Sequence, residues 1–243
     1  MCPKKKVEVA HGHIKNTAYR IGRMAESGQI FGKPPFMTMI VAAKASGKSC
    51  LVRYLTYVYA KEFSYITCIT PTALNGYYSQ FLPEGHIHDT YSDELIQKVV
   101  DKQEGFKKAN KDVHMLLILD DILASPDVKF EQRKASILNK LFAANRHWNI
   151  SLLICSQKLK GLPRLCRDNV DFTCIGRTMR SAWDDLYDEY GNTDKKAFFT
   201  FLEDGTQNYR FLLYQAQVKK ASEHFKCFSV PASFQERKFR MLF

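Results

Sequence analysis

The chain has 243 residues, of which 45% are hydrophobic and 13% aromatic, a composition that supports a buried core and argues against disorder. With 36 Lys and Arg against 25 Asp and Glu, the formal net charge is +11. No apolar run is long enough to cross a bilayer, and the charged first eight residues do not predict a signal peptide. The chain has seven cysteines, an odd number, and none forms a CxxC pair. This argues against a disulfide framework and a zinc ribbon, so we expect a reducing compartment.

The alternation of apolar runs and amphipathic stretches predicts strands separated by helices from about residue 36. The expected strands are 36–42, 65–70, 114–119, 150–155, 172–175 and 209–214, and the expected helices are 48–61, 92–109, 130–144, 181–190 and 194–203. Such alternation predicts an α/β fold in which a mostly parallel sheet is covered by helices on both faces.

The positive charge lies mainly at the two ends of the chain. Residues 1–34 hold seven basic and two acidic residues (+5), and residues 219–243 hold six and two (+4), which leaves +2 for residues 35–218. We therefore expect a basic amino-terminal extension (1–34), a core domain (35–218) and a basic, partly apolar carboxy-terminal tail (219–243). This distribution fits a polyanionic partner such as DNA or RNA, and it fits equally well a basic surface that only aids solubility.

The sharpest local motif is Ala42-Ala-Lys-Ala-Ser-Gly-Lys-Ser49, between the first expected strand and the first expected helix. Small residues let successive backbone N–H groups wrap a phosphate chain, while Lys48 reaches the β- and γ-phosphates and the Ser49 hydroxyl holds Mg²⁺. The helix that begins here directs the positive end of its dipole at the anion. Ala42 and Ala45 stand where glycines are usual, so Ala42 is expected to avoid positive φ. The residues expected to bind ATP are Ala43, Lys44, Ala45, Ser46, Gly47, Lys48, Ser49 and Cys50.

Two further strands end in polar residues that suit nucleotide hydrolysis. Asp120 and Asp121 follow the strand 114–119; we expect Asp120 to hold Mg²⁺ and Asp121 to act as the base or orienter for the attacking water. Gln157 follows the strand 150–155 and is expected to sense the γ-phosphate or that water, although a polar residue that merely closes a strand is the alternative. Arg146, just before the same strand, is a candidate arginine finger for an adjacent subunit or an ordinary cation at a helix end.

Taken together, these motifs resemble the FtsK/HerA superfamily of P-loop ATPases. More narrowly, they resemble the poxvirus-type genome-packaging ATPases of large DNA viruses, virophages and Polinton-like elements. The resemblance covers about residues 36–180 and rests on 42–49 as Walker A, 116–121 as Walker B, and the run 145–157. The chain departs from the pattern at Ala42, where a glycine is expected, and at Asp121, where many such enzymes have Glu.

The resemblance implies a RecA/FtsK-like fold of the ASCE division and a motor that uses ATP and Mg²⁺ to drive double-stranded DNA into a preformed capsid. It further implies a pentameric or hexameric ring in the host cytoplasm, a viral factory or the virion, with a capsid protein or portal vertex as partner. Each ATP would lie between Lys48, Ser49, Asp120 and Asp121 of one subunit and an arginine of the next: Arg146 first, then Arg167 or Arg177. Gln157 would couple the state of the γ-phosphate to movement.

DNA contacts are expected mostly with phosphates, because a packaging motor must tolerate any sequence. The candidates are Lys158, Lys160, Arg164 and Arg167, with Lys107 and Lys108 as a second choice, and a solvated loop is an equal alternative for each.

Three other functions remain open from the sequence. A nucleoside or nucleotide kinase has the same kind of phosphate loop but needs an Arg-rich lid and no Gln after the fourth strand. A replication helicase or loader shares the core and differs only weakly in sequence. The departures from the usual motifs at Ala42 and Asp121 leave open a non-catalytic module that binds nucleotide and DNA. The presence of Lys48, Ser49 and a pair of acids argues against that module.

Overall fold

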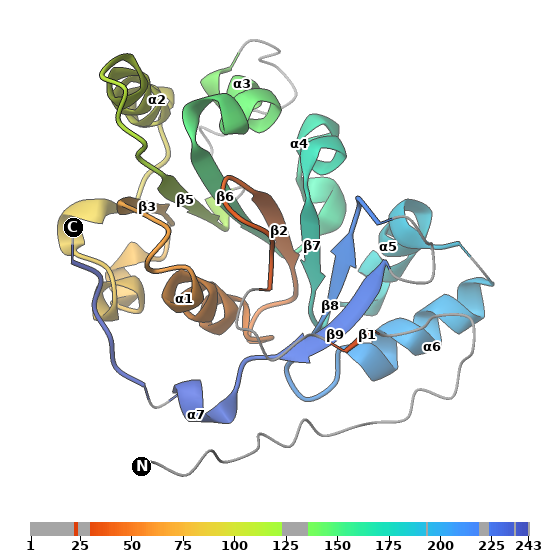
Figure 1. Ribbon diagram of the computed structural model, residues 1–243. Helices are drawn as coiled ribbons and strands as arrows, with labels where there is room; N and C mark the ends of the chain where they lie inside the picture. Colours follow the sequence, from red (N-terminus) through yellow and green to blue (C-terminus); the bar gives the residue numbers. More distant parts are fainter. Residues whose placement is uncertain are drawn as a thin grey trace.

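The computed structural model describes residues 22–23, 30–122, 136–192, 194–218, 224–235 and 237–242. Within them the strands form one nine-stranded sheet, in the order β1-β9-β8-β7-β2-β6-β5-β3-β4 (Figure 1). The strands are β1 (Gly22–Arg23), β2 (Met37–Val41), β3 (Tyr65–Ile69), β4 (Ile87–His88), β5 (Met115–Asp120), β6 (Ile150–Ser156), β7 (Phe172–Ile175), β8 (Arg210–Gln215) and β9 (Phe225–Ser229).

Strands β2 to β7 run parallel, and β8 alone is antiparallel to its neighbours β7 and β9. The predicted mostly parallel sheet is therefore confirmed. β6 lies between β2 and β5, with Val41 beside Ser156 and Asp120 beside Cys155. This order brings the phosphate loop after β2, the two acids at the end of β5 and Gln157 after β6 to one edge of the sheet.

The described helices cover both faces of the sheet, as predicted (Figure 1). α1 packs on one face with Leu51, Val52 and Leu55, whereas α2 to α6 contribute to the apolar cluster on the other face. None of the helices in the described ranges is both long and apolar enough to span a membrane. The helices are α1 (Lys48–Val58), α2 (Asp93–Lys108), α3 (Ile137–Ala144), α4 (Arg164–Asn169), α5 (Trp183–Tyr190), α6 (Lys195–Gly205) and α7 (Ala232–Gln235).

Short elements and the end of the chain differ most from the sequence-based expectations. The helix expected over 130–144 begins at Ile137 in the structure, and residues 130–135 lie outside the described part. β1, β4, β9, α4 and α7 were not predicted, because two to six residues carry too little periodicity. Lys4, Lys5 and Lys6, which contribute charge to the predicted basic extension, also lie outside the described residues.

The carboxy-terminal segment packs back on the domain. β9 pairs with β8, the ring of Phe239 contacts the rings of Tyr57 and Phe81, and the Met241 amide donates to the Phe81 carbonyl at 2.9 Å. Arg53 of α1 lies against the rings of both Phe234 and Phe239. The division into extension, core and tail stays a prediction, but part of the expected tail completes the sheet.

Candidate functional site

The phosphate loop joins β2 to α1 through a backbone that requires small residues. Gly47 has φ +89° and precedes the first residue of α1, and Ala45 has φ +59°. Ala42 has no positive φ, as predicted; its side chain is fully buried. A Cβ placed on Gly176 would lie only 2.9 Å from the Ala42 Cβ, so Gly176 makes room for a methyl group where the usual motif has glycine.

Contacts from outside the motif hold this loop in shape. The Arg177 carbonyl accepts hydrogen bonds from the Ala43 amide (2.8 Å) and from the Ser46 hydroxyl (3.0 Å). The Lys48 ammonium is buried and donates to the carbonyls of Ala42 (2.8 Å) and Ala43 (3.3 Å). Lys44 and Ala45 are exposed at the rim of the loop, and Ser49 and Cys50 lie partly buried in the first turn of α1. The loop thus positions its lysine on the inner side.

Asp120 ends β5 as a buried carboxylate with one satisfied oxygen. Its side chain accepts a hydrogen bond from the Tyr78 hydroxyl at 2.8 Å through Oδ2, while Oδ1 is buried without a hydrogen-bond partner among the described residues. Burial raises the pKa of the carboxyl above its ordinary value, and the charge of Asp121 adds to this. The Tyr78 hydrogen bond, the charge of Lys48 and a weaker interaction with the Cys155 thiol lower it. An unpaired buried carboxylate oxygen near a phosphate loop fits the oxygen ligands that Mg²⁺ prefers.

Asp121 and Gln157 meet at the same edge. The Gln157 side-chain amide donates to Asp121 Oδ2 at 3.2 Å. Asp121 adopts φ +52°, a conformation uncommon for a residue other than glycine, and its amide donates to the Cys155 carbonyl at 3.3 Å. Asp121 and Gln157, singled out from two separate motifs, are therefore in contact.

The three finger candidates lie in different places. Arg146 precedes β6, at the amino-terminal edge of the sheet, and forms an ion pair with Asp171. The seven residues of β6 separate it from Gln157 by about 20 Å, so its guanidinium cannot serve the phosphate loop of its own chain. Its side chain is 59% exposed, which leaves it accessible to a neighbour. Arg177 is exposed beside the phosphate loop, and Arg167 is 14% exposed and paired with Glu189.

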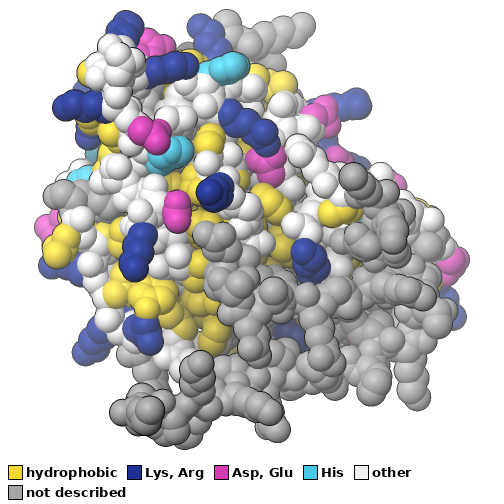
Figure 2. Space-filling view, in the orientation of Figure 1, with side chains coloured by type: hydrophobic (Ala, Val, Ile, Leu, Met, Phe, Trp, Pro, Cys, Tyr) yellow, Lys and Arg dark blue, Asp and Glu magenta, His cyan; other side chains and the backbone are white. Residues whose placement is uncertain are grey.

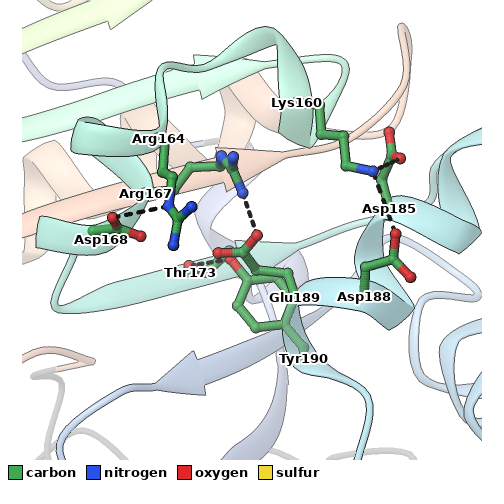
Figure 3. Close-up of polar contacts among 9 residues, drawn as sticks. All are labelled: Lys160, Arg164, Arg167, Asp168, Thr173, Asp185, Asp188, Glu189 and Tyr190. Atoms are coloured by element: carbon green, nitrogen blue, oxygen red, sulfur yellow. Dashed lines mark hydrogen bonds and ion pairs between the residues drawn. The ribbon is translucent and has the colours of Figure 1, made fainter.

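Three of the six cations proposed to contact DNA have acidic partners. In Figure 3, Lys160 lies between Asp185 (2.6 Å) and Asp188 (3.3 Å) of α5. Arg164 pairs with Asp168 at 3.4 Å within α4, and Arg167 of α4 reaches Glu189. These pairs join the segment after β6 to α5.

The remaining candidates are on separate parts of the surface. The side chain of Lys158 is exposed just past β6, whereas Lys107 donates to the His147 carbonyl at 3.1 Å near Arg146, and Lys108 is exposed next to it. On the face seen in Figure 2, Lys and Arg side chains lie dispersed among acidic and apolar ones. The DNA contacts therefore stay a prediction for every one of these residues.

Sequence reasoning missed two groups at the site and one at the opposite edge of the sheet. Tyr78, whose hydroxyl donates to Asp120, begins a single 3₁₀ turn (Tyr78–Gln80) after β3, which is too short for a periodic pattern. The Arg177 carbonyl that anchors the phosphate loop is a main-chain group, which a sequence motif cannot mark. Asp171, which pairs with Arg146 and accepts a hydrogen bond from the Met37 amide at 2.8 Å, directly precedes β7 and belongs to none of the motifs.

Comparison with known families agrees with this geometry. The profile of the Poxvirus A32 protein family matches residues 28–229, which include every element from β2 to β9. The chain belongs to the Poxvirus A32 protein family.

Sequence comparison also finds relatives from viruses. The chain is 30% identical to protein 075L of Invertebrate iridescent virus 6 over 144 residues, which cover 57% of the chain and 53% of that relative. It is 25% identical to the DNA packaging protein OPG160 of Vaccinia virus (strain Copenhagen) over 150 residues, which cover 58% of the chain and 53% of that protein. The chain spans about half the length of the curated relatives it matches.

Solved structures confirm the fold. The genome packaging NTPase B204 from Sulfolobus turreted icosahedral virus 2, in complex with ATP-gammaS, superposes with a TM-score of 0.62 at 20% identity and covers 82% of this chain and 100% of its own. The pCW3 conjugation coupling protein TcpA, with ATPgS, gives a TM-score of 0.57 at 14% identity over 80% of this chain and 59% of its own. The predicted α/β fold, with a mostly parallel sheet and a phosphate loop, is therefore confirmed.

Proposed function

We propose that this A32-family protein is an ATPase that drives double-stranded DNA into a viral capsid. The observation that carries the proposal is the buried, half-paired Asp120 carboxylate near the lysine of a phosphate loop. A structural aspartate would be expected to satisfy both oxygens, whereas an acid that serves a nucleotide keeps one available. A DNA packaging protein among the relatives supports packaging as the use of that hydrolysis.

Each group of residues at the site has a separate role in ATP hydrolysis. The amides of residues 43–49 and the Lys48 ammonium bind the β- and γ-phosphates of ATP. A Mg²⁺ ion held by Ser49 and Asp120 would add positive charge against the same phosphates. Asp121 accepts the proton of the attacking water or orients it, and the Gln157 amide, which already donates to Asp121, reports the state of the γ-phosphate to the segment after β6.

The position of Arg146 supports a ring in which sites form between subunits. Arg146 lies at the opposite edge of the sheet from the phosphate loop of its own chain, so a catalytic role would require the nucleotide of a neighbour. An arginine finger in that place increases the rate about 10³–10⁵-fold. DNA within the ring would contact phosphate-binding cations, and we retain Lys158, Lys107 and Lys108 as the candidates without a carboxylate partner in the described part of the chain.

The test is steady-state ATP hydrolysis at high protein concentration, with and without long double-stranded DNA. Lys48→Ala and Arg146→Ala are expected to abolish DNA-stimulated turnover, and Arg146→Ala is expected to retain nucleotide binding. Arg240→Ala, which removes an exposed arginine of the carboxy-terminal segment, is the matched control and is expected to behave as wild type. Turnover that ignores both DNA and Arg146 would contradict a motor and favour a small acceptor substrate.

Mixing the two inactive variants distinguishes a neighbour's arginine from a structural one. In a randomly mixed ring, an interface is complete when the Arg146→Ala subunit supplies Lys48 and the Lys48→Ala subunit supplies Arg146. At equal amounts about a quarter of the interfaces meet this condition, so partial activity should return. No recovery, with intact ring assembly, would argue that Arg146 acts within its own chain or only in folding.

A further inference from the structure

Tyr209 is a large aromatic side chain beside the phosphate loop for which neither the motifs nor the proposed hydrolysis gives a role. It is 67% exposed. A Cβ placed on Gly47 would lie 3.5 Å from the Tyr209 Cδ1, so the ring rests against the last glycine of the loop, at the start of α1. Most of the ring is open to solvent next to the place where a phosphate chain is expected to bind.

The backbone at Tyr209 is unusual for such a residue. Asn208 and Tyr209 have φ +53° and φ +57°, and the Arg210 amide donates to the Gln207 carbonyl at 3.0 Å. This is the pattern of a type I′ turn, in which Gly, Asn and Asp dominate because a bulky side chain at positive φ is strained. Such strain persists at functional sites, and a turn alone has no need of tyrosine.

The surroundings fix this turn at the edge of the sheet that carries the nucleotide site. The Arg210 guanidinium donates to the carbonyls of Gln207 and Asp204, and the next residue, Phe211, is buried. β8 then pairs with β7, with Leu212 opposite Ile175. Tyr209 is therefore held at a defined place rather than at the tip of a long loop.

We propose that Tyr209 stacks on the base of the nucleotide whose phosphates occupy residues 43–50. This inference rests on the proposed function as far as nucleotide binding is concerned. An aromatic face recognises the π-face of any base, and stacking accounts for a sizeable part of binding where a ring is available. The exposed ring rests on Gly47, directly before Lys48 and Ser49, where a base that extends from the bound phosphates could reach it. Purine nucleotides, with the larger face, are expected to bind more tightly than pyrimidine nucleotides.

The experiment compares ligands with and without a base. Binding of ATPγS and of inorganic tripolyphosphate is measured by calorimetry, with Mg²⁺, for wild type, Tyr209→Ala and Tyr209→Phe. We expect Tyr209→Ala to weaken ATPγS about tenfold and to leave tripolyphosphate unchanged, and Tyr209→Phe to bind like wild type. Tyr209→Asn removes the ring but tolerates positive φ, so it repeats the test if Tyr209→Ala folds poorly. Leu165→Ala, at a half-exposed apolar residue of α4, is the surface control.

The outcomes separate this inference from the function on which it rests. Unchanged ATPγS affinity in Tyr209→Ala and Tyr209→Asn overturns the stacking role, as does equal weakening of both ligands, which would indicate a distorted loop. Lower affinity for DNA with unchanged ATPγS affinity would assign the ring to DNA and also overturn it. Wild type that binds neither ligand would instead contradict the proposed function, and the inference would fall with it.

Discussion

Two alanines of the phosphate loop differ in backbone conformation, so replacing each with glycine should change the free energy of unfolding in opposite directions. Ala45 has φ +59°, whereas Ala43, two residues earlier, has no positive φ. Left-handed backbone costs an alanine about 1–2 kcal/mol relative to glycine. Against this, glycine lowers the free energy of unfolding by about 0.4–1 kcal/mol, because it increases the entropy of the unfolded chain. Because Ala45 is exposed, its methyl group contributes little packing, so Ala45→Gly should stabilise the protein by about 0.5–1 kcal/mol.

Thermal unfolding without nucleotide measures this difference. For a chain of this size, such a gain corresponds to a rise in Tm of about 1–4 °C. Ala43→Gly is the matched control: it keeps the amide that donates to Arg177, relieves no strain and should lower stability by about 0.4–1 kcal/mol. The reasoning is refuted if Ala45→Gly has the same or a lower Tm than wild type, or if both substitutions act in the same direction.

The other predictions concern the buried acid and the packing behind the loop. Asp120→Asn should abolish hydrolysis yet stabilise the nucleotide-free protein by roughly 1 kcal/mol, because it removes a buried charge while an Asn oxygen can still accept from Tyr78. The pKa of Asp120 is higher in the folded chain than in the unfolded chain, where it is about 3.9. The free energy of unfolding therefore falls as pH rises from that value through the raised pKa. The difference in Tm between Asp120→Asn and wild type should therefore increase as pH is raised from 4 to 8. A difference in Tm that does not change with pH would contradict the burial argument. Gly176→Ala should destabilise by about 1–3 kcal/mol, since its Cβ would lie 2.7 Å from Phe211 and 2.9 Å from Ala42, and adding Ala42→Gly should restore part of the loss in a urea titration. Full additivity of these two changes would argue against their contact.

Comparing the sequence-based expectations with the structure shows which features are local. The strand 114–119 and the phosphate loop could be predicted because each is encoded by neighbouring residues: a continuous apolar run, and small residues before Gly47 and Lys48. The contact between Asp121 and Gln157 was expected only in outline, since it depends on β6 lying beside β5. Strand order in a parallel sheet is set by how the intervening helices cross over, and no residue pattern in one strand contains it.

The sequence alone determined the chemistry of this protein: the phosphate loop, two acids at a strand end and a Gln after the next strand, each fixed by residues adjacent in the chain. Only the tertiary structure decided which groups support them. Tyr78 beneath Asp120, the Arg177 carbonyl on the phosphate loop and Tyr209 on Gly47 all come from segments 30 or more residues away or from main-chain atoms. The structure also put Arg146 at the far edge of the sheet. Such contacts depend on packing between distant elements, which local propensity and periodicity do not record.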